Sequence, residues 1–213
     1  DGSCGVEAVT NILPSVAGGK WRNKVYSMFA DAKRVIEDEY SPSDALRYDD
    51  NGKAYFKCGG HISIGVEGMS GKEIGEAVRL NCGIIYALFR KRLSNSYTCN
   101  NIEMDFDRYV STKYQPVYVK NNILEFRLPS RVQSVKQMMR RYELMYILMD
   151  FSINKPNGSH SSLLKKCEPI VSLMYDGDAD KVAEIMTLAK SFHKFLKSGA
   201  RDENIRDHIA HCF

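Results

Sequence analysis

The stretch Gly59-Gly60-His61-Ile62-Ser63-Ile64-Gly65 alternates polar and apolar side chains directly after a pair of glycines. Successive side chains of a β-strand point to opposite faces of a sheet, so His61 and Ser63 would share one face and the two isoleucines the other. The glycines let the backbone and a ligand approach each other closely. A polar face on a central strand needs hydrogen-bonding partners or a ligand, so this stretch predicts a strand and a candidate site.

A second alternating stretch, Ile123-Leu124-Glu125-Phe126-Arg127-Leu128, follows a turn at residues 120–122. Its pattern places Glu125 and Arg127 on one face and three apolar side chains on the other. Residues 114–119 precede the same turn and predict the partner strand, in which Pro116 indicates an edge or a bulge. We therefore expect several strands to bring carboxylate, imidazole and guanidinium groups to one face of one sheet.

The remainder of the chain predicts further strands and helices around this sheet. Ser70 and Glu73 have the spacing of a capping box and predict a long helix that ends near Arg92. Apolar periodicity and turn residues predict short strands at 6–10 and within 53–65, a turn at 49–52, and helices at 22–40, 133–151, 161–174, 179–196 and 202–211. The fold class is therefore α+β, with an α+β domain over residues 1–152 and a helical tail over residues 153–213.

The length and composition of the chain argue against a disordered, a membrane-spanning and a nucleic-acid-binding protein. The 213 residues allow one large domain or one domain with a helical appendage, and 44% hydrophobic with 26% charged residues exclude disorder as the main interpretation. No apolar run approaches the roughly 20 residues that span a bilayer. The net charge of +4 is too small to argue for nucleic acid. We expect a cytoplasmic protein with neither a membrane nor a nucleic acid as its partner.

The charge is uneven along the chain. Between Arg127 and Lys166, eight basic residues face only two acidic ones. This run is typical of a solvated helix face, but it would equally provide a field for an anionic ligand such as a nucleotide phosphate. Both interpretations stay open.

Six cysteines, at positions 4, 58, 82, 99, 167 and 212, include no CxxC pair, so neither a zinc ribbon nor a thioredoxin motif is present. Free thiols in a reducing compartment are the expected state. Cys4, which follows Asp1-Gly2-Ser3, raises the hypothesis of a cysteine hydrolase. Such a nucleophile needs a histidine, and none of the five histidines lies in a recognisable partner motif. A small buried cysteine is the competing interpretation.

The polar residues of the predicted strands suggest a specific chemistry. Glu7 adds a carboxylate within the strand-like run at 6–10, although a charged residue between apolar ones also fits a strand that faces solvent. Carboxylates with a histidine suit Mg²⁺ or Mn²⁺, and arginines suit phosphate or carboxylate. A sheet face that holds metal, imidazole and guanidinium is a plausible site for phosphoryl transfer from ATP.

The order and spacing of four segments resembles the amidoligase family, which is similar to the carboxylate–amine ligases of the glutamine synthetase and glutamate–cysteine ligase superfamily. The segments are residues 1–10, 59–65, 92–99 and 108–127, so the resemblance covers about residues 1–150. It implies an antiparallel sheet of a glutamine-synthetase-like ligase domain with flanking helices and a helical C-terminal tail.

The resemblance also implies an ATP-dependent ligase, in which a carboxylate is phosphorylated and an amine then attacks the acyl phosphate. The implied cofactors are ATP and Mg²⁺ or Mn²⁺, and the substrates are small-molecule or peptide carboxylates and amines. The implied site residues are Glu7, His61 and Glu125 for the metal, His61, Ser63 and Arg127 for the nucleotide, and Arg127 and Arg92 for catalysis.

Two departures from the family pattern qualify this expectation. Ser63 stands where the family has a second histidine, and a hydroxyl is a poorer metal ligand. The family's acidic first strand would lie upstream of Asp1, so we expect a fragment or processed part of a longer protein, unless another chain supplies that strand. The alternatives are a non-catalytic structural or binding component of a larger assembly that keeps the ligase fold, and a cysteine hydrolase that uses Cys4.

Overall fold

The computed structural model describes residues 22–24, 26–28, 30–31, 34, 46–48, 50–52, 54–56, 60–93, 116–129, 132 and 134–198. They form a mixture of helices and antiparallel strands, as the predicted α+β class requires. The strand expected at 6–10 and the helix expected at 202–211 lie outside the described residues. So do Cys4 and Glu7.

The chain divides into two compact units. One contains the described residues between 60 and 129 and from 143 to 198, and the other contains those between 22 and 56 and from 132 to 142. The domain boundary expected near residue 152 stays a prediction.

The smaller unit contains a two-stranded sheet. β1 (Leu46–Tyr48) pairs antiparallel with β2 (Ala54–Phe56), and the predicted turn joins them. Gly52 in this turn has a φ of 75°, which glycine adopts without strain. The strand β1 was not expected from the sequence. Residues 22–24, 26–28, 30–31 and 34 are helical, within the range predicted for the first helix.

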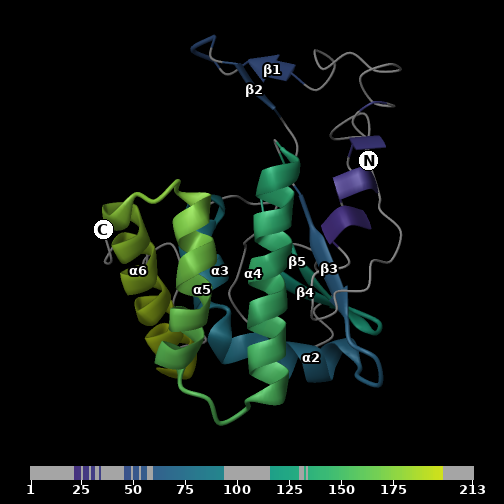
Figure 1. The fold of residues 1–213 in the computed structure, drawn as a ribbon, viewed down its shortest axis with the longest axis vertical. Helices are drawn as coiled ribbons and strands as arrows, with labels where there is room; N and C mark the ends of the chain where they lie inside the picture. The colour runs from purple at the N-terminus through teal and green to yellow at the C-terminus, as the bar shows by residue number, and fades with distance from the viewer. Residues whose placement is uncertain are drawn as a thin grey trace. The chain divides into compact units, whose positions relative to one another are not determined.

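The larger unit is built on a three-stranded antiparallel sheet of order β3-β5-β4, drawn in Figure 1. Its strands are β3 (Ile62–Gly65), β4 (Val117–Lys120) and β5 (Ile123–Phe126). The tight turn between β4 and β5 contains Asn121 with a φ of 54°, a left-handed conformation that asparagine tolerates. β4 is an edge strand, as Pro116 just before it predicts.

The two faces of this sheet differ as the alternation predicts. Ile62, Val117, Leu124 and Phe126 are buried in the hydrophobic core, whereas Ser63 is exposed. On the core side, α2 (Gly71–Val78) packs against β4 and β5. The apolar face therefore anchors the sheet, and the other face is left for polar side chains.

The helix expected from Ser70 to about Arg92 begins as predicted but does not continue unbroken. Ser70 and Glu73 form the capping box, with the Glu73 backbone N–H donating to the Ser70 hydroxyl at 3.2 Å. The chain then passes through the 3₁₀ turn η2 (Arg79–Asn81), α3 (Gly83–Leu88) and the 3₁₀ turn η3 (Arg90–Arg92). The prediction of a single long helix was wrong, because the turn at η2 brings Gly83 against the helix α6 (Ala179–Ser198). A Cβ at Gly83 would lie 2.7 Å from the Ala189 carbonyl oxygen.

Gly71 is the point at which α2 touches the β4–β5 turn. A Cβ there would lie 2.7 Å from the Ile123 carbonyl oxygen and 2.8 Å from that of Asn121. Both atoms belong to the backbone and cannot swing away, so we expect Gly71→Ala to lower the free energy of unfolding by about 1–3 kcal/mol. Urea denaturation followed by circular dichroism measures the change.

The control for this substitution is Lys72→Ala, at the neighbouring exposed position of α2. It should change the free energy of unfolding by less than about 0.5 kcal/mol. A Gly71→Ala protein as stable as the wild type would show that the helix and the turn are not in close contact.

Three long helices complete the described chain: α4 (Val135–Asn154), α5 (His160–Met174) and α6 (Ala179–Ser198). The predicted helices 133–151, 161–174 and 179–196 are confirmed with small shifts of their ends. α6 packs against both α3 and α5, and α5 and α6 stand side by side in Figure 1. Within the part of the chain that the structure describes, no helix is both long and apolar enough to cross a membrane.

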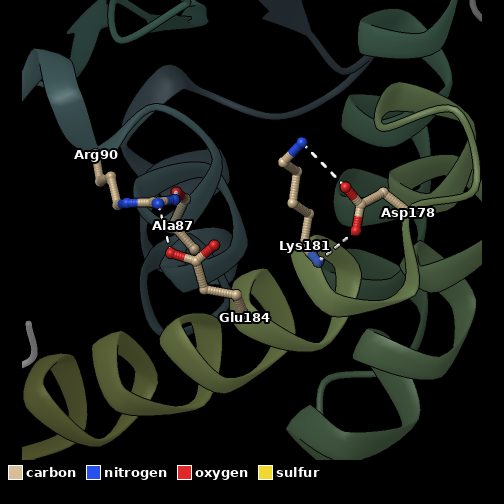
Figure 2. A network of polar contacts seen from close by, with 5 residues as sticks. All are labelled: Ala87, Arg90, Asp178, Lys181 and Glu184. Carbon is tan, nitrogen blue, oxygen red and sulfur yellow. Dashed lines mark hydrogen bonds and ion pairs between the residues drawn. The ribbon is translucent and has the colours of Figure 1, made fainter.

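Polar contacts also join η3 to α6, as Figure 2 shows. Arg90 donates from Nη2 to the Glu184 carboxylate at 2.6 Å, and Lys181 pairs with Asp178 at 3.0 Å. Asp178 also caps α6, because its carboxylate accepts the Lys181 backbone N–H at 3.1 Å. The side chains of Lys181, Asp178 and Glu184 are exposed and that of Arg90 is partly buried, so the pair of Lys181 and Asp178 adds little to the stability of the fold.

Candidate functional site

The polar face of the larger sheet brings the predicted site residues of β3 and β5 together. In the register of the sheet, Ser63 lies opposite Glu125 on one side and Tyr118 lies opposite it on the other. His61 directly precedes β3 and Arg127 directly follows β5, so each lies two positions from a member of that row, on the same face. The alternation predicted which residues of each strand share a face, and the pairing of β3 with β5 makes Ser63 and Glu125 neighbours.

Glu125 is the centre of this group, which we call the Glu125 cluster and define as His61, Ser63, Tyr118, Glu125 and Arg127. Its Oε1 accepts a hydrogen bond from Nη1 of Arg127. The same Oε1 lies 3.8 Å from Nδ1 of His61. The side chains of Glu125 and Arg127 are only 11% and 14% exposed, whereas that of His61 is 37% exposed. Solvent therefore reaches the cluster beside His61 and Ser63.

Arg127 uses only part of its hydrogen-bonding capacity. Its backbone N–H donates to the Pro116 carbonyl at 2.8 Å, and Nη1 donates to Glu125. Nε is buried and has no hydrogen-bond partner among the described residues. Because an unpaired buried donor is costly, a guanidinium with spare donors is suited to an oxyanion such as a carboxylate or phosphate.

The described residues offer a partial donor set for a metal ion. They contain no group of three or more histidine, cysteine, aspartate or glutamate side chains that could hold one. Glu125 supplies one carboxylate, and His61 lies beside it. Magnesium is commonly held by one or two carboxylates together with substrate phosphates, so this set fits an ion held mainly by phosphate oxygens. The expected third ligand, Glu7, lies outside the described residues, and the three-ligand site stays a prediction.

The remaining predicted residue, Arg92, lies on a different element. It belongs to η3, and the contacts that define the Glu125 cluster do not include it. Sequence reasoning missed Tyr118, which the register places beside Glu125. The signal was available, because Tyr118 and Lys120 alternate with Val117 and Val119 along β4.

The arrangement can bind an anion through Arg127 and can hold that guanidinium in a fixed orientation through Glu125. We compared the chain with protein-family models, with curated proteins and with solved structures, and none of the three comparisons found a match.

Proposed function

We propose that this chain is part of an ATP-dependent carboxylate–amine ligase, which forms an amide bond through an acyl phosphate. One observation supports the proposal above the others. A nearly buried guanidinium with unused donors lies beside a carboxylate and an imidazole on one face of an antiparallel sheet. Such a group can neutralise charge on a phosphate that is being transferred.

Four members of the cluster have a role in this proposal. Arg127 binds a phosphate oxygen through the donors that Glu125 leaves unused. Glu125 orients Arg127 through their ion pair, and its second carboxylate oxygen is a ligand for Mg²⁺. His61, which precedes β3, and Ser63, on β3, are both exposed and contact the nucleotide. Arg92 remains a proposed second catalytic arginine.

ATP and Mg²⁺ would supply the phosphoryl group and the charge neutralisation that such a ligase needs. The contribution of the chain is then placement: it holds the anion, fixes the guanidinium and keeps the carboxylate within reach of both. The substrates are a small-molecule or peptide carboxylate and an amine. The carboxylates that the described face lacks would come from Glu7, from an upstream segment or from another chain.

Replacing Arg127 with lysine tests whether MgATP binding depends on the planar guanidinium or only on its positive charge. Lysine keeps the positive charge but loses the planar fork of donors, so we expect MgATP to bind about 10- to 100-fold more weakly. Isothermal titration calorimetry on the full natural protein measures the affinity. Arg127→Gln should weaken binding at least as much.

The matched control is Lys72→Met, which removes an exposed cation on α2. It should leave the affinity for MgATP unchanged. Unaltered binding by a folded Arg127→Lys protein, or no MgATP binding by the full-length wild type, would contradict the proposal.

The second candidate, a non-catalytic binding component, is favoured by one feature of the cluster. Arg127 already neutralises Glu125, and a neutral pair with spare donors can bind an anion without promoting a reaction. A protein that binds MgATP but releases no phosphate in the presence of mixed carboxylates and amines would favour this candidate. The cysteine hydrolase hypothesis depends on Cys4 and stays a prediction.

A further inference from the structure

Two histidines that are far apart in sequence form a stacked pair in the larger unit. The ring of His160, the first residue of α5, lies parallel to the ring of His193 on α6. The ring centroids are 4.0 Å apart and the planes differ by 5°. Parallel stacking of neutral aromatic rings is favourable when the rings are offset, whereas two charged imidazolium rings at this distance would repel each other.

The pair lies where three elements meet. Nδ1 of His193 donates a hydrogen bond to the Leu80 carbonyl of η2 at 2.7 Å. A Cβ at Gly83, the first residue of α3, would lie 3.0 Å from the His193 backbone nitrogen. The same turn of α6 therefore contacts the start of α5, the turn η2 and the start of α3.

The surroundings of His160 disfavour its charged form. Both ring nitrogens are buried and lack a hydrogen-bond partner of normal geometry within the described part of the chain. Burial, followed by the positive charges of His193 and Lys190, lowers the pKa of His160 to about 4, and the Ala189 backbone opposes the shift only in part. His160 also stands at the positive end of the α5 dipole.

The charged groups that face the ring come from α6, as Lys190 and His193. From η2 the group that faces the pair is the neutral Leu80 carbonyl, and from α5 the first turn contributes serine hydroxyls. None of these groups could compensate a proton on His160. Parallel rings also direct their nitrogen lone pairs along parallel lines, so the two imidazoles cannot converge on one metal ion.

We propose that the stacked pair of His160 and His193 is an acid-sensitive contact that holds the start of α5 against α6 while the His160 ring is neutral and releases it when His160 takes up a proton. The released element is the first turn of α5 with the preceding segment at residues 155–159. This inference is independent of the ligase proposal, because none of its residues belongs to the Glu125 cluster.

The direction of the pH dependence follows from the lowered pKa of His160. A released histidine takes up a proton near its ordinary pKa of 6.5, whereas the stacked one does so near 4. The contact therefore contributes fully above about pH 6.5 and loses its contribution as the pH falls from 6.5 towards 4. We expect the opening equilibrium of the α5 start to rise about twentyfold between pH 7 and pH 5.

Hydrogen exchange of the full protein, corrected for intrinsic rates and read on peptides that cover residues 156–175, tests this expectation. His160→Phe keeps a flat ring on His193 but cannot titrate, so its protection should change less than twofold over the same range. Lys190→Gln removes one charge that disfavours protonation of the stacked His160, so the opening equilibrium should rise less between pH 7 and pH 5 than in the wild type. Identical pH profiles for the wild type and His160→Phe would overturn the proposal.

An NMR titration of the histidine ring protons in the wild type tests the same inference without any substitution. His160 should titrate near pH 4, and its midpoint should rise in His193→Phe. A midpoint near 6.5 for His160 in the folded protein would overturn the proposal even if the phenylalanine variants fail to fold.

Discussion

Replacing Glu125 with alanine is expected to lower the free energy of unfolding by about 3–5 kcal/mol, because it leaves the Arg127 charge nearly buried and without its partner. The two side chains are 11% and 14% exposed, so water can replace the lost carboxylate only in part. Since small domains are stable by only about 5–15 kcal/mol, a loss of this size would be visible in any denaturation experiment. Urea unfolding followed by circular dichroism measures it.

The double variant Glu125→Leu/Arg127→Met provides the control. Removing both charges together leaves no unpaired ion, so its stability should lie within about 1–2 kcal/mol of the wild type. Inorganic phosphate should raise the melting temperature of Glu125→Ala more than that of the wild type, because it can replace the missing counter-charge. A Glu125→Ala protein as stable as the wild type would show that the pair is solvated in solution.

The sheet face could be predicted because it depends on local alternation. Successive side chains of a strand point to opposite faces of the sheet. In Ile62-Ser63-Ile64 and Leu124-Glu125-Phe126, the apolar residues identify the face that packs on the core, and this assigns every other residue to the opposite face. The structure buries Leu124 and Phe126 and leaves Ser63 exposed, as this reasoning requires. The order β3-β5-β4 has no such local signal, because it depends on which strands pair across long stretches of chain.

Other features depend on tertiary contacts and were missed or mistaken for that reason. The helical spacing of apolar residues continues through Arg79–Asn81, so the local sequence does not predict the turn η2. The turn is explained by a tertiary contact, the close approach of Gly83 to α6. The stacking of His160 on His193 likewise requires α5 and α6 to be docked. Within the candidate site, Arg92 was proposed from the family resemblance; it lies on η3, and its role stays a prediction.

Phe192→Ala is expected to be as destabilising as the loss of Glu125, for a different reason. Phe192 on α6 is 2% exposed, and its ring meets Tyr86 of α3 edge to face with centroids 5.7 Å apart. Removing a buried aromatic ring leaves a cavity and costs about 3–5 kcal/mol. Urea denaturation measures the loss, and Leu173→Ala, at an exposed position of α5, should cost less than about 1 kcal/mol.

The same variant tests whether α5 and α6 unfold together with the rest of the larger unit. Cys82, just before α3, and Cys167, in α5, are both buried, and burial raises the pKa of the Cys167 thiol to about 12 and that of Cys82 further still. Both thiols should therefore resist alkylation at pH 8 until they are exposed. Because α6 packs against α3 and α5 alike, Phe192→Ala should lower the urea concentration at which each cysteine reacts by the same amount. If mass spectrometry instead detects Cys167 labelled well before Cys82, the two helices form a separate domain, and the boundary expected near residue 152 is the correct one.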